Sequence, residues 1–163
     1  MVRCNTLKLM LVGAFAIGGA SVISMAFKVA QATPPQGVTA TLLAGPVELD
    51  EFDVMVQTDD YKAHAKTHGV SDAFITHLEI APGGNTGWHS HPGLVFALVR
   101  SGELTLYEDD FTRSVYPAGT GLTEEPGHVH IGVNEGDTDL ELIVFFLSPR
   151  GAGTRIDQPA PQP

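Results

Sequence analysis

The sequence predicts an all-β fold, built as an antiparallel sandwich or barrel. Short runs of five to nine residues, rich in Val, Ile, Leu, Phe and Thr, recur along the chain. Turn-forming stretches such as "APGGN", "RSGE" and "NEGDTD" separate these runs. After residue 32, no stretch of 12 residues repeats with the period of a helix. This spacing of strands and turns is typical of antiparallel all-β domains.

Seven strands are expected from these runs, and the first two show a period-two alternation. They lie, in chain order, within residues 50–58, 59–69, 72–80, 94–99, 103–107, 128–133 and 140–147. In 59–69, Lys62, His64, Lys66 and His68 alternate with Tyr, Ala and Thr residues. A period of two suits a half-exposed strand better than a helix.

The first 32 residues have the pattern of a secretory signal peptide. Arg3 and Lys8 precede an uncharged, mostly apolar run over 9–27, and "AQA" at 30–32 places small residues at a cleavage site. We therefore expect export to the periplasm, the cell surface or the medium. Because the apolar run is long, an uncleaved membrane anchor is the alternative.

The rest of the chain divides into three parts. We expect a Pro/Gly-rich linker over 33–45, one β-barrel domain over 46–150 and a disordered Pro-rich tail over 151–163. A domain of this size can bury a real core.

The charge of the exported part excludes several partners. Removing Arg3, Lys8 and Lys28 from the nine basic residues leaves six against 19 acidic ones, a net charge of −13 with neutral His. Such a surface repels nucleic acid and anionic membranes, so contact with a membrane is expected only through an uncleaved N-terminal segment. The single cysteine, Cys4, lies in the signal, so the exported domain has no thiolate for metal binding or catalysis.

All seven histidines follow the signal, and four of them form two pairs of identical spacing. The pairs are His89 with His91 in "GWHSHPG" and His128 with His130 in "HVH". On an extended strand, residues i and i+2 face the same side, so each pair can present two imidazoles to one point. Two such strands could bind a divalent metal, whereas one H-x-H pair alone is often an ordinary polar surface feature.

These residues resemble the metal-binding motifs of the cupin superfamily. Gly83, His89, His91 and Gly102 match the frame G-x5-H-x-H-x3-E-x6-G of the first motif. The stretch "GLTEEPGHVHIGVN" resembles the second motif, with His130 three residues before Asn134. The resemblance covers about residues 70–148. It implies a cupin-type β-barrel, a jelly-roll-like double-stranded β-helix, with metal ligands pointing into its mouth.

The chain departs from that pattern at one ligand. The glutamate of the first motif falls on Val95, so only His89, His91 and His130 carry over. The resemblance thus implies a three-His site, as in some iron dioxygenases of this superfamily. His128 is a candidate fourth ligand if its segment is extended, with a hydrogen-bonded turn residue as the equal alternative.

Other polar residues could reach such a site. They are the candidate pocket residues His77 and Tyr107, and the acidic pair Glu124 and Glu125, which precedes the second motif and could approach from a loop.

The histidine set restricts the metal but leaves the function open. Imidazole nitrogens favour Fe, Zn, Mn, Ni or Cu over Mg or Ca, which prefer oxygen ligands. The first hypothesis is a metal-dependent enzyme on a small molecule, with an oxygenase preferred over an isomerase or lyase. The alternative is a non-catalytic module that holds a small ligand or a metal. A homodimer is a further expectation from the fold, and fold alone does not decide the activity.

Overall fold

The computed structural model describes residues 31–162, which form strands, turns and loops. The predicted signal over 1–32 lies almost wholly outside the described residues. The strands are, in chain order, β1 (Gln36–Leu49), β2 (Asp53–Gln57), β3 (Lys62–Lys66), β4 (Ser71–Asn85), β5 (His89–Ser90), β6 (Leu94–Ser101), β7 (Glu103–Glu108), β8 (Arg113–Pro117), β9 (Gly121–Glu124), β10 (His130–Val133), β11 (Leu140–Pro149) and β12 (Ile156–Asp157). Within residues 31–162, no helix is long and apolar enough to cross a membrane.

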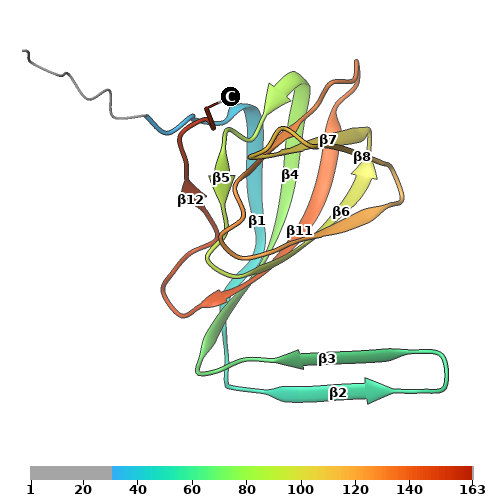
Figure 1. Cartoon of the computed structure of the whole chain (residues 1–163), viewed down its shortest axis with the longest axis vertical. Coiled ribbons are helices and arrows are strands. Elements are labelled where there is room, and N and C mark those ends of the chain that lie inside the picture. Colours follow the sequence, from blue (N-terminus) through green and yellow to red (C-terminus); the bar gives the residue numbers. More distant parts are fainter. Residues whose placement is uncertain (1–30, 163) are drawn as a thin grey trace, which may run out of the picture.

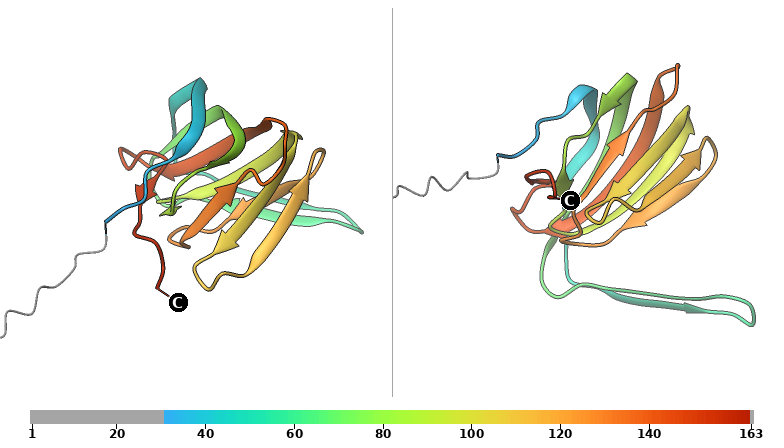
Figure 2. Two further views of the ribbon diagram at one scale, coloured as in Figure 1. Left: turned by 90° about the horizontal axis from the view of Figure 1, so that it is seen from above. Right: turned by 45° about the horizontal axis from the view of Figure 1, so that its top comes forward.

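Ten of these strands form a nearly closed antiparallel barrel, which confirms the predicted fold class (Figure 1). One wall has the order β1–β4–β11–β6–β9, and the other has the order β12–β5–β10–β7–β8. The walls meet where β10 pairs with the end of β4, at Val133 and Asn85. Figure 2 shows the strands curving around a shared interior.

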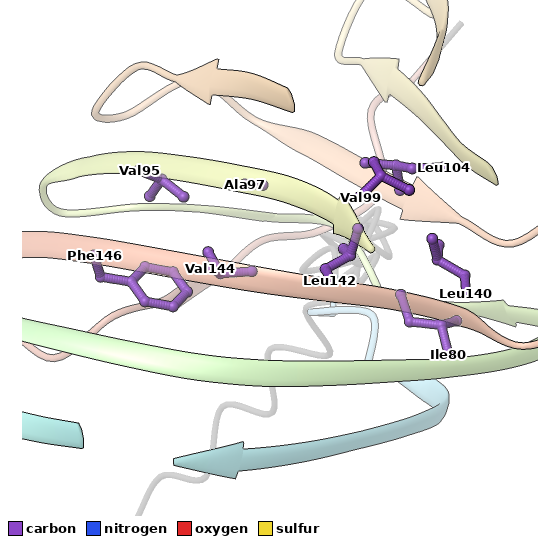
Figure 3. Close-up of a cluster of buried hydrophobic side chains, with 9 residues drawn as sticks. All are labelled: Ile80, Val95, Ala97, Val99, Leu104, Leu140, Leu142, Val144 and Phe146. Atoms are coloured by element: carbon purple, nitrogen blue, oxygen red, sulfur yellow. The ribbon is translucent and has the colours of Figure 1, made fainter. Parts of the chain in front are cut away.

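The core follows the alternation of β6 and β11. Every second residue of each strand is buried, and facing positions pair in register, as Val95 does with Phe146 and Ala97 with Val144. Figure 3 shows these side chains meeting in one cluster. Its members are Ile80, Val95, Ala97, Val99, Leu104, Leu140, Leu142, Val144 and Phe146. Phe96 and Leu98 point outward instead and are 42% and 57% exposed.

A buried asparagine fixes the turn that follows β10. Asn134 is fully buried, and its Nδ2 donates to the carbonyls of Ile80 and Thr138 at 2.8 Å each. Its Oδ1 accepts from the backbone N–H of Gly136 at 3.0 Å. The side chain therefore ties β4, β10 and the turn before β11 together, with its polar groups satisfied as burial requires.

The structure corrects the prediction of a linker over 33–45. Residues 36–45 belong to β1, which pairs with β4 from Val38 opposite Ile80 to Leu49 opposite Ser71. The small and polar residues at the start of this segment do not show the pattern of a strand, so the sequence did not predict it. The strand lies at the edge of one wall and is largely exposed, so its sequence needs no apolar alternation.

The tail over 151–163 also differs from the expected disorder. Within the described part, β12 pairs with β5, placing Ile156 opposite Ser90 and Asp157 opposite His89. Ala32 forms an isolated bridge with Pro159. The proline-rich composition suggested disorder. Proline is nevertheless compatible with an edge strand, because the other residues of the segment can still donate their backbone N–H groups.

The hairpin of β2 and β3 extends away from the barrel (Figure 1). It confirms the period-two alternation that predicted a strand near residues 59–69. Asp53 accepts hydrogen bonds from Lys66 and His64 at 2.7 Å each, and these contacts lower the pKa of Asp53. His64 is thus a surface residue far from the two H-x-H pairs.

Candidate metal centre

The pairing of β5 with β10 brings the two histidine motifs together. His130, the first residue of β10, lies directly opposite His89 on β5 in the antiparallel register. Directly opposed residues project to the same face of a sheet, so both rings enter the barrel. His91 follows β5 immediately, two residues after His89, and joins them from the same strand end.

The three rings form one buried cluster. Ring centroids lie 4.5 Å apart for His89 and His130, 4.8 Å for His89 and His91, and 5.2 Å for His91 and His130. The exposed fraction of each residue is 6% or less. One ligand nitrogen from each ring lies within 4.8 Å of the other two. The three residues therefore offer a convergent set of nitrogen donors.

Backbone carbonyls set the tautomer of all three rings. In each, Nδ1 contacts a carbonyl oxygen, which can only accept, so Nδ1 carries the proton. The acceptors are Gly87 O for His89 at 2.9 Å, Thr154 O for His91 at 2.5 Å and His128 O for His130 at 3.2 Å. Each Nε2 is left with a free lone pair. Metal-binding histidines are oriented in this way.

A carboxylate completes the cluster from a different strand. Glu124, the last residue of β9, places Oε2 3.0 Å from Nε2 of His91 and Oε1 3.5 Å from Nε2 of His130. Its side chain is 12% exposed. The sequence suggested that Glu124 could reach the site from a loop. The structure brings it there on a strand instead, through pairing that the sequence pattern did not reveal.

The environment favours neutral rings for His89 and His130 beside an ionised Glu124. Burial lowers the pKa of His89 to about 2, and the charges of His130, Arg155 and His91 add to this effect. Burial also lowers the pKa of His130, although Glu124 opposes it. Burial alone would raise the pKa of Glu124, but its contacts with His91 and His130 lower that pKa overall.

The donor set fits a divalent transition metal. Three neutral imidazoles are typical ligands of Zn, Cu, Fe and Ni. Nε2 of His130 is buried and has no hydrogen-bond partner among the described residues, which is costly unless a ligand or ion satisfies it.

Comparisons with known proteins agree with this arrangement. The family model described as "Cupin domain" matches residues 76–146, which include both histidine motifs and the core strands β6 and β11. The chain therefore contains a cupin domain. No curated protein matches the chain significantly.

Several solved structures of low sequence identity are similar to this chain. The polyketide cyclase RemF from Streptomyces resistomycificus is 16% identical, with a TM-score of 0.55 and 82% of each chain covered. A double-stranded β-helix protein from Klebsiella pneumoniae is 22% identical, with a TM-score of 0.47, covering 67% of this chain and 85% of that one. Recombinant oxalate oxidase in complex with glycolate is 24% identical, with a TM-score of 0.45, covering 50% of this chain. The chain spans less than half (44%) of the oxalate oxidase.

The histidine cluster of this cupin adjoins an apolar pocket of about 300 Å³. Its apolar lining comes from β1, β4 and β11, and Thr154 and Arg155 also line it. Arg155 donates from Nε to Asp157 at 2.5 Å. Its Nη2 is buried and lacks a hydrogen-bond partner among residues 31–162. The pocket therefore combines apolar walls, histidine nitrogens and a partly unpaired cation.

The other predicted site residues lie elsewhere, and this corrects three expectations. His128 is 66% exposed, with its ring 3.5 Å from Glu125, because its segment turns before β10 begins. Only its backbone carbonyl contributes to the site, by accepting a hydrogen bond from Nδ1 of His130. His77 alternates with the pocket residue Leu78, so it faces outward and pairs with Glu141 at 3.0 Å. Tyr107 likewise alternates with the inward Leu106.

Tyr107 belongs to a separate polar cluster on the outer face. Its hydroxyl donates to Oε1 of Glu135 at 2.7 Å, and Arg113 donates to Oε2 of the same carboxylate at 2.7 Å. The bonds from Arg113 and Tyr107 lower the pKa of Glu135 to about 2. This cluster joins β7, β8 and the turn after β10, and its role is structural.

The buried histidines predict how the metal-free protein responds to acid. Folded His89 and His130 stay neutral below pH 6.5, whereas the unfolded chain protonates them there. Their contribution is present above pH 6.5 and is lost as the pH falls. Because the folded pKa of His89 is about 2, this residue should lower the free energy of unfolding by about 1.4 kcal/mol per pH unit below pH 6.5, and His130 should add a drop in the same direction. Urea unfolding at pH 7 and pH 5, followed by Trp88 fluorescence, measures this drop.

A matched variant assigns the effect. His89→Gln cannot titrate in this range, so the drop between pH 7 and pH 5 should be smaller than in the parent protein. Equal stability of the parent at both pH values would contradict the burial of neutral histidines.

Proposed function

We propose that this cupin binds a divalent transition metal through His89, His91 and His130 and takes a small anionic molecule in the adjoining pocket. One observation carries the proposal. Three buried rings have their Nδ1 atoms bonded to backbone carbonyls, and one ligand nitrogen of each ring lies within 4.8 Å of the other two. Fe, Zn, Mn, Ni and Cu suit such donors. When bound, such an ion would polarise a coordinated substrate or acidify a coordinated water.

The pocket supports a ligand with an apolar body and an anionic end. Val38, Leu78 and Phe146 provide apolar surface, and Arg155 provides the cation. A buried guanidinium nitrogen without a partner is satisfied by a carboxylate oxygen, its usual planar counterpart. In this proposal the histidines bind the metal ion and orient the ligand, and the apolar wall excludes water. Arg155 selects a ligand with a negative charge.

Of the two functional hypotheses, we propose an enzyme of oxygenase type, with an isomerase or lyase as the next candidate. We also propose export, on the basis of the N-terminal segment with its basic start and apolar run. Homodimerisation stays a prediction.

Metal content tests the site directly. The chain without its first 32 residues, reconstituted with Fe(II) or Zn(II), should contain about one metal ion per chain by elemental analysis. His130→Ala should lose most of it, because two remaining imidazoles bind weakly. His128→Ala is the control and should keep its metal, since this side chain is exposed away from the cluster. A parent protein with no metal after reconstitution would contradict the proposal.

Anion binding tests the pocket. In the zinc-loaded protein, Arg155→Met should weaken the binding of monocarboxylates, from acetate to phenylacetate, by roughly 10-fold, which corresponds to one charged hydrogen bond. Calorimetric titration measures the dissociation constants. Arg150→Met removes the same charge at an exposed pair with Glu48 and should change nothing. Equal weakening in both variants would point to net charge rather than to the pocket.

Oxygen uptake separates an oxygenase from a binding module. The Fe(II)-loaded protein, supplied with a panel of diketones, thiols, phenols and small carboxylates, should consume oxygen with at least one class. His91→Ala should abolish that uptake by removing a metal ligand. A loaded protein that consumes none with any compound would favour the non-catalytic alternative.

A further inference from the structure

We infer that Glu124 on β9 is the fourth protein ligand, in the place left by the glutamate that falls on Val95 in the first cupin motif. This inference rests on the proposed metal site. The ligand set would then be three histidines and one carboxylate, with the carboxylate supplied by a neighbouring strand.

The strand register places the Glu124 carboxylate close to the position that a glutamate at residue 95 would occupy. β6 and β9 pair antiparallel, and Val95 lies directly opposite Glu124. Directly opposed residues have their Cβ atoms about 5 Å apart on the same face of the sheet. Val95 is 1% exposed and points into the barrel, so the Glu124 side chain enters the same interior.

The contacts of Glu124 call for a cation. Nδ1 of His91 donates to Thr154 O, and Nδ1 of His130 lies against His128 O, so in the neutral rings both Nε2 atoms are acceptors. The Glu124 carboxylate is also an acceptor, yet its oxygens lie 3.0 Å and 3.5 Å from these nitrogens. Acceptors at this separation repel unless a proton or a metal ion lies between them.

The distances suit shared coordination. Two adjacent ligands, each about 2.1 Å from one metal ion, lie about 3.0 Å apart in an octahedral site and about 3.4 Å apart in a tetrahedral one. The two contacts of Glu124 span this range. An additional proton on His91 would explain the shorter contact but would leave the buried Nε2 of His130 without a partner.

The charge balance points the same way. Three neutral imidazoles leave the full charge of a divalent ion in a buried site, which is unfavourable without a counter-charge. Glu124 provides that charge at 12% exposure. Its neighbour Glu125 is 75% exposed and pairs with His128, so it cannot serve.

Metal affinity and a spectroscopic readout test the inference. Glu124→Gln keeps the size of the side chain and removes its charge, while Glu125→Gln is the matched control. Zinc affinity is measured by competition with a chelator, and the visible absorption of the cobalt(II)-loaded protein reports its ligand set. Glu124→Gln should bind zinc at least about 10-fold more weakly and change the cobalt spectrum. Glu125→Gln should do neither.

A relocation experiment tests the role of the register. Glu124→Val should weaken zinc binding, and adding Val95→Glu should restore at least part of the affinity by moving the carboxylate to the facing strand. Circular dichroism verifies folding. If the double variant does not fold, the isosteric Glu124→Gln decides.

The outcomes separate the inference from the proposed function. A parent protein that binds zinc, with Glu124→Gln equal to it in affinity and cobalt spectrum, overturns the ligand role of Glu124 and leaves the three-His site standing. That result assigns the contact with His91 to a shared proton. A parent protein that binds no metal overturns both.

Discussion

The pairing of β5 with β10 is the constraint on which the candidate site depends. It places His89 opposite His130, and the short distance along the chain adds His91. Burying imidazole rings is unfavourable unless their polar atoms are satisfied, and three carbonyls satisfy the Nδ1 side of each ring. The Nε2 side remains, and for His130 it has no partner among the described residues. A buried unsatisfied nitrogen costs about 1–3 kcal/mol. A group that costs stability in this way is expected at a binding site rather than in a core.

The position of the carboxylate follows from the barrel itself. β6 carries Val95, Ala97 and Val99 on its inner face, and these pack against β11 (Figure 3). A glutamate at 95 would lie at the boundary between that core and the histidines. Glu124 reaches the same region from the end of β9, next to an open loop, so its backbone does not interrupt the packing of β6 on β11. The polar site still adjoins the apolar core, because Phe146 lies with its ring centroid 5.5 Å from that of His91.

Much of the fold could be predicted from sequence because its central strands are short runs rich in apolar and β-branched residues, bounded by turn-forming stretches. The runs at 72–80, 94–99 and 140–147 correspond to β4, β6 and β11, whose inner residues form the core. The edge elements β1 and β12 could not be predicted, because an exposed edge carries no clear alternation and pairs mainly through its backbone. Apolar runs and period-two alternation therefore predicted the core strands and the exposed hairpin of β2 and β3, and missed the two edge elements, whose sequences carry neither signal.

The same distinction applies to the site. Spacing within a strand is a local property, so it indicated the two H-x-H pairs, and the resemblance to the cupin motifs selected His89, His91 and His130. His77 and Tyr107 were misplaced because periodicity shows that neighbours face opposite sides without showing which side is inner. His128 was uncertain because a turn, rather than an extended strand, precedes β10. Glu124 depends on the register of β9 against β6, which is set by tertiary pairing and leaves no local pattern in the sequence.

The C-terminal segment shows how tertiary pairing changes the meaning of a sequence. Its proline-rich composition is typical of a disordered tail, yet Thr154 accepts the Nδ1 proton of His91, and Arg155 lines the pocket. Gln158 bonds to Ser90 through its side chain and to Trp88 through its backbone N–H. The tautomer of His91 therefore depends on a carbonyl 63 residues further along the chain. Because that carbonyl leaves Nε2 of His91 free to face Glu124, the segment over 154–158 is a structural part of the candidate metal centre.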